Sequence, residues 1–117
     1  MTDYDKLIAE LRRWTADHDD HVRAAVQLLI DHDYWLRTSR FVRAAVVKAE
    51  DGRYIIWRKA REAFDAGEFD RSSTTELAVL DLAIALGENR YKLDHMGTAN
   101  SASIAAAVQV AAGVRPR

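Results

Sequence analysis

The sequence contains no cysteine, and this absence removes several kinds of chemistry at once. Without cysteine there is no disulfide framework, no thiolate nucleophile and no cysteine-based zinc site. Proline and glycine are scarce too: the single proline is Pro116, and there are five glycines. No proline- or glycine-rich linker divides the chain, so we expect a single domain over residues 1–117. Five glycines also leave little material for a phosphate-binding loop.

Long uncharged apolar runs are missing as well. No run in the sequence approaches the roughly 20 residues that a membrane-spanning helix needs. The first six residues are acidic and polar, unlike the start of a secretory signal peptide. Hydrophobic residues nevertheless make up 49% of the chain and charged residues 30%, a balance typical of a folded globular protein. We therefore expect a cytoplasmic protein with no membrane partner.

Apolar residues recur at helical spacing along almost the entire chain. This spacing predicts an all-α protein, a compact bundle of five or six helices. The expected helices cover residues 3–16, a segment capped by Asp19 or Asp20 that carries Val22 to Ile30, residues 38–49, residues 58–66, a segment between Ser73 and Gly87, and residues 101–112.

Residues 38–57 allow two interpretations. Apolar residues at positions 41, 42, 45, 46 and 49 fit a helix that is broken by Asp51 and Gly52. The β-prone run from Tyr54 to Trp57 could instead pair with residues 42–48 in a hairpin, or form an extended segment near residues 53–57. The helical spacing fits better than strict alternation, so we favour the helix.

The segment from Ser73 to Gly87 gives the clearest prediction. Ser73 and Glu76 have the spacing of a capping box, in which each side chain satisfies a free backbone donor of the other residue. From residue 77 to residue 86 the only polar residue is Asp81, so we expect this helix at the centre of the fold, with Leu77, Leu80 and Ile84 deeply buried. Asp81 should lie in a narrow polar stripe that faces solvent.

Histidine and aspartate cluster in ways that resemble metal ligands. His32-Asp33 is similar to the doublet of helical metal-dependent phosphohydrolases, in which His18 or His21 and Asp81 would have to supply further ligands. However, His21 and His32 are 11 residues apart, which is about 16 Å along one helix, too far to share an ion. We therefore expect no metal and no cofactor, and keep a metal-dependent hydrolase only as a third alternative.

Charge is distributed very unevenly. Residues 1–34 carry a net charge of −4, residues 35–61 carry +6 and residues 62–117 carry −3. Basic residues interleaved with Trp35, Tyr54 and Trp57 suit contacts to phosphates and stacking on bases, or contacts to an acidic protein. The candidate partner- or nucleic-acid-binding residues are Arg37, Arg40, Arg43, Arg53, Arg58, Lys59 and Arg61.

Several segments resemble small accessory proteins encoded by actinobacteria and their phages or mobile elements. The resemblance spans roughly residues 22–112, most of a domain of the expected size, and it implies a context without assigning a role to any residue. The segments are Asp33-Tyr34-Trp35-Leu36-Arg37, Phe41-Val42-Arg43-Ala44, Ile56-Trp57 with Ala60-Arg61, and Ser73 to Leu80.

Together these features favour a non-enzymatic binding protein. It would act through a protein partner or as a homo-oligomer, and the alanine-rich helix over residues 101–112 could dock on its own bundle or form half of a homodimer seam. The alternative is a small DNA- or RNA-binding accessory factor that uses the basic segment 35–61. The sequence contains no motif that places a nucleophile beside a base, so nothing in it points to an enzyme.

Overall fold

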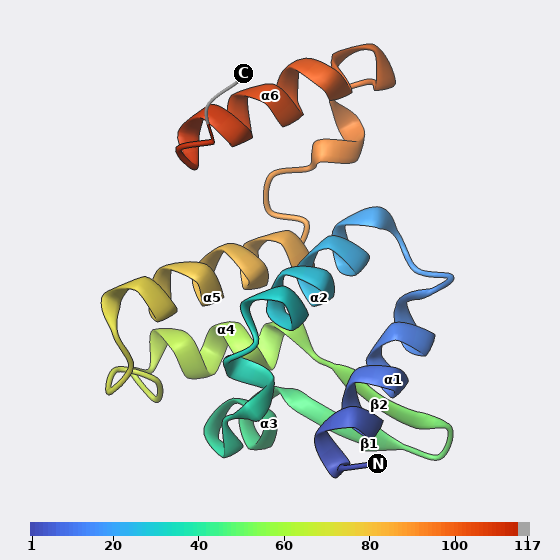
Figure 1. Ribbon diagram of the computed structural model, residues 1–117, viewed down its shortest axis with the longest axis vertical. Helices are drawn as coiled ribbons and strands as arrows, with labels where there is room; N and C mark the ends of the chain where they lie inside the picture. Colours follow the sequence, from blue (N-terminus) through green and yellow to red (C-terminus); the bar gives the residue numbers. More distant parts are fainter. Residues whose placement is uncertain (115–117) are drawn as a thin grey trace.

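The computed structural model describes residues 1–114 and contains, within them, six α-helices and one two-stranded hairpin (Figure 1). This arrangement confirms the predicted helical bundle with a short hairpin. The elements are α1 (Asp3–Thr15), α2 (Asp20–His32), the 3₁₀ turn η1 (Trp35–Arg37), α3 (Ser39–Ala45), β1 (Val46–Ala49), β2 (Gly52–Ile55), α4 (Trp57–Asp65), α5 (Thr74–Gly87), the 3₁₀ turns η2 (Leu93–His95) and η3 (Thr98–Asn100), and α6 (Ser101–Ala111).

Five helices and the hairpin form the body of the molecule. α2 and α5 lie side by side, α4 packs against α5 and α3, and α1 packs against α2 and the hairpin (Figure 1). The apolar stripes that the sequence predicts for α1 and α2 face the interior, as Leu11 and Leu29 show. The largest fully buried side chains are Trp35, Phe41, Phe69, Leu11, Leu29, Leu80, Ile84 and Val26.

The expected helix over residues 38–49 is wrong beyond Ala45. Thr38 caps α3 by accepting a hydrogen bond from the Phe41 N–H, but Val46 leaves the helix in an extended conformation and begins β1. β1 pairs with β2 in an antiparallel register that places Val46 opposite Ile55. Two adjacent β-branched valines favour a strand, and in this pairing the apolar Ile55 is buried in the core. Gly52 supplies the positive φ that the turn requires.

The start and most of the inner face of α5 agree with the prediction. Ser73 and Glu76 form the expected capping box, and Leu80 and Ile84 are fully buried, whereas Leu77 is only partly buried. The outer face differs, because Leu82 is 43% exposed. α5 is therefore central on one side only, and its opposite side presents apolar surface to water.

Gly87 is the last residue of α5, as expected, but it does not end the helix by adopting a left-handed conformation. The left-handed residue after the helix is Asn89, with φ of 56°, and Gly87 itself lies within the helix. A Cβ atom at Gly87 would overlap the indole ring of Trp57. The absent side chain thus lets the first residue of α4 pack directly on the backbone of α5.

We predict that Gly87→Ala destabilises the protein by about 1–3 kcal/mol, the usual cost of overpacking a filled site. In an open helix the same change would stabilise by about 1 kcal/mol, because alanine is the better helix former. Denaturant unfolding of Gly87→Ala in the parent and in a Trp57→Ala background separates the two effects. Destabilisation of equal size in both backgrounds would show that Trp57 is not the cause.

Candidate protein-binding surface

The segment after α5 leaves the body. We call residues 88–114 the arm; it consists of a linker with η2 and η3, followed by α6. Asn89, Lys92 and Gly97 adopt positive φ along the linker and turn the chain away from α5. α6 stands apart from the other five helices (Figure 1). The chain therefore ends in a helix that its own core does not enclose.

Exposed apolar side chains concentrate in the arm. Among residues 1–114, eight large hydrophobic side chains are exposed, and six of them belong to the arm, whereas Leu82 lies on α5 and Met1 at the N-terminus. An accumulation of this kind marks an interaction surface more often than it marks ordinary solvent-facing surface. The six are Tyr91, Leu93, Met96, Val108, Val110 and Val114.

α6 is apolar on opposite sides and carries no charge. Val108 is 57% exposed and Val110 is 66% exposed, although two residues along a helix point in nearly opposite directions. No residue of α6 is buried, and the sequence has no charged residue from position 96 to position 114. Its polar side chains are Ser101, Ser103 and Gln109, and a helix with apolar side chains on opposite sides is normally covered by other protein on more than one side.

A groove of about 450 Å³ separates the arm from the body. Its body wall includes Ala24 of α2 and Leu86 of α5, and its arm wall includes Leu93 and Ser101. His21 closes one end, where its Nδ1 lies 3.0 Å from the carbonyl oxygen of Leu86.

Leu86 of the groove wall lies on the same face of α5 as the exposed Leu82. Ala78, Leu82 and Leu86 recur every four residues and so share one face of that helix. We call these three residues the α5 stripe. The groove itself is mixed, because three aspartates line it beside the apolar residues: Asp19, Asp20 and Asp94.

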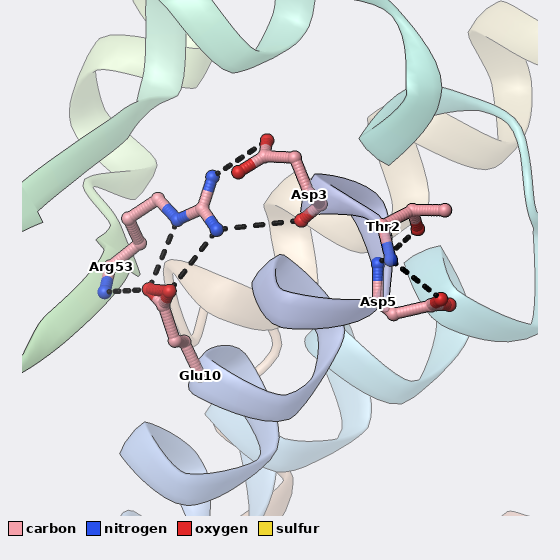
Figure 2. A network of polar contacts seen from close by, with 5 residues as sticks. All are labelled: Thr2, Asp3, Asp5, Glu10 and Arg53. Carbon is pink, nitrogen blue, oxygen red and sulfur yellow. Dashed lines mark hydrogen bonds and ion pairs between the residues drawn. The ribbon is translucent and has the colours of Figure 1, made fainter.

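The basic residue Arg53 is committed to α1. Its backbone N–H, Nε and Nη2 groups donate hydrogen bonds to the Glu10 carboxylate at 2.9, 3.0 and 3.1 Å, and its Nη1 pairs with Asp3 at 3.2 Å (Figure 2). Its side chain is only 14% exposed. The guanidinium thus fastens the hairpin to α1, and these hydrogen bonds hold the pKa of Glu10 below its ordinary value.

Arg61 and Arg37 also face carboxylates. Arg61 on α4 pairs with Asp81 at 2.8 Å and with Glu88 at 3.3 Å, and so joins α4 to α5. Asp81 therefore lies at the surface, as expected, where it is paired. Arg37 pairs with Asp33 at 2.8 Å and stacks over the ring of Tyr4.

The other four candidate residues face solvent. Arg40 and Arg43 on α3, and Arg58 and Lys59 on α4, are exposed and have no ion pair within residues 1–114. Arg40 and Arg43 line a shallow hollow together with Glu68. The structure thus divides the seven basic residues into three that join elements of the fold and four that face solvent.

The histidine and aspartate clusters do not converge. Within the described part of the chain, no group of three or more histidine, aspartate or glutamate side chains is placed to hold a metal ion. The ring of His32 packs near Tyr34 instead, while His21 contacts the end of α5. The same residues include no helix long and apolar enough to cross a membrane.

Comparisons with protein-family models, curated proteins and solved structures gave no match to this chain. Roles for its residues therefore come from the geometry described above.

We predict that Glu10→Gln lowers the free energy of unfolding at neutral pH. The same variant should make this free energy depend less steeply on pH in the acid range. A lowered pKa in the folded state means that the unfolded chain binds the Glu10 proton more readily. The stabilisation is therefore complete above the ordinary glutamate pKa of about 4.3, and is lost as pH falls through the lower folded value.

Urea unfolding across a pH series measures this effect. Glu62→Gln is the matched control, because Glu62 is exposed and has no ion pair within residues 1–114. If the two variants lose stability with falling pH in the same way, the contact between Glu10 and Arg53 is not a source of acid sensitivity.

Proposed function

We propose that this chain is a small non-enzymatic binding protein that acts through protein–protein contact, with the arm and the α5 stripe as its binding surface. The observation that carries the proposal is α6, a helix with no charge and no buried residue that stands apart from the body. The proposed setting is the cytoplasm, as an accessory protein of a phage or mobile element, in keeping with the resemblance of residues 22–112.

The physical reason lies in the stability of short helices. α6 has 11 residues, and isolated helices shorter than about 12–15 residues are marginal in water even when they are rich in alanine. Gly113 closes the helix in a left-handed conformation, and the Val114 N–H bonds back to the carbonyl of Gln109. Such a cap holds the helix end, but a helix of this length gains most of its stability from packing against another surface.

We predict that Val108→Glu/Val110→Glu removes association through the arm. A charge on each side of α6 would have to leave water when a partner covers the helix, so binding should weaken at least about tenfold. Pull-down with purified chain from a lysate of the encoding organism, with bound proteins quantified, measures the loss; captured copies of the chain itself are counted too.

The matched control is Ala9→Glu/Ala66→Glu, which adds the same charge at two exposed positions of the body. Equal binding by the parent, the arm variant and the control, towards every protein tested and towards the chain itself, would remove the arm as a binding surface.

A second candidate function is binding of DNA or RNA through the four basic residues that face solvent. Arg58 and Lys59 lie in the first turn of α4, where the positive end of the helix dipole disfavours cations, so helix stability does not explain them. The aromatic residues that would stack on bases are less available. Trp35 is buried in the core, and Trp57 packs on Gly87.

If this second function holds, Arg40→Glu/Arg43→Glu should reduce the slope of log affinity against log salt by about 2, because two phosphate contacts are lost. Binding to duplex and single-stranded DNA is measured across a salt series. Lys6→Glu/Arg12→Glu on exposed positions of α1 makes the same change in net charge and should keep the parent slope. A parent chain that binds neither DNA at low salt excludes DNA binding through these residues.

A further inference from the structure

We infer that the partner of the arm is a second copy of this chain, in a twofold dimer in which each α6 packs on the α6 and the α5 stripe of the other copy. This inference rests on the proposed function, since it names the occupant of the same surface. Three properties of the molecule lead to it: its excess exposed area, its charge, and the size of α6.

The exposed area is larger than a monomer of this size requires. The chain exposes 7875 Å², whereas a folded monomer of 13.2 kDa is expected to expose about 6,400 Å². The radius of gyration is 14.9 Å, against an expected value of about 13.4 Å. The excess exceeds the roughly 800 Å² that each partner contributes to a stable interface. The chain alone therefore exposes enough surface for one side of a dimer interface.

The absence of charge on α6 suits self-association. In a twofold interface each surface meets its own copy, so charges near the axis face like charges, which repel. Between residues 96 and 114 there is no charge to repel. Across the rest of the chain, including residues 88–94 of the arm, acidic and basic residues are common on the surface, so α6 is the segment best suited to meet itself.

The size of α6 indicates that it contacts more than the other α6. Eleven residues of helix are about 16 Å long and about 10 Å wide, a footprint of roughly 160 Å², which is far below one partner's share of a stable interface. Val108 and Val110 also point in different directions, so one neighbour cannot cover both. The α5 stripe, with Leu82 at its centre, provides the second surface.

Alanine makes this packing possible. Five of the eleven residues of α6 are alanine, and short side chains allow helix axes to approach toward the lower end of the usual 8–10 Å range. The groove between the arm and the body gives the partner's helix access to Leu86. Each arm thus reaches over the α5 of the other copy.

The test is the mass of the purified full chain in solution, measured by sedimentation equilibrium over a wide concentration range. The parent should sediment as a dimer. Val108→Glu/Val110→Glu should raise the dissociation constant at least about a hundredfold, because two unpaired carboxylates would have to leave water. Glutamate is a better helix former than valine, so dissociation would not reflect melting of α6, and circular dichroism checks this.

Two further variants sharpen the result. Leu82→Glu, on the body, should also dissociate the dimer, because Leu82 meets the partner's arm, while Ala9→Glu/Ala66→Glu should leave it intact. A monomeric parent overturns the inference, as does a dimer that resists the arm variant. A dimer that Leu82→Glu leaves unchanged overturns the contact with the α5 stripe.

The proposed function is judged separately. If the pure parent is monomeric, but captures a protein that the arm variant does not capture, the dimer inference is wrong and the proposed function stands. If the parent is monomeric and captures nothing through the arm, both the dimer inference and the proposed function are wrong.

Discussion

The contact among Trp35, Phe41 and Phe69 is the one on which the rest of the body depends. The ring centroids of Trp35 and Phe69 are 5.4 Å apart and those of Phe41 and Phe69 are 6.1 Å apart, so the cluster joins η1, α3 and the loop before α5. The indole N–H of Trp35 donates to the carbonyl oxygen of Glu76 at 3.0 Å, which fixes the first turn of α5 against the cluster. The position of α5 then sets the point from which the arm departs.

The sequence predicts those elements whose pattern is long and local. Helical spacing identified α1, α2 and α5, and the offset of Ser73 from Glu76 identified a cap, because each signal lies within a few turns of chain. This approach failed for residues 46–49, because the spacing of their apolar side chains fits both a helix and a strand. Contacts distant in sequence decide between them: Ile55 needs a buried position, and Arg53 bonds to a glutamate 43 residues away.

The candidate binding surface could be predicted only in part, for the same reason. The excess of positive charge over residues 35–61 is plain in the sequence, but its partial neutralisation by Asp3, Glu10 and Asp81 depends on folding. The arm had a local signal, an alanine-rich segment without charge. That composition predicts a docking helix, but it does not tell whether the helix packs on its own bundle, because local pattern carries no information about which chain covers it.

Gly87 marks a boundary between two kinds of packing environment. Up to this residue, substitutions act on a filled interior, as the indole of Trp57 against the Gly87 backbone illustrates. Beyond it, no residue from 91 to 114 is buried, so substitutions there leave the filled interior untouched. If the arm binds as proposed, such substitutions change affinity while the scaffold stays the same, and recognition can diversify faster than architecture.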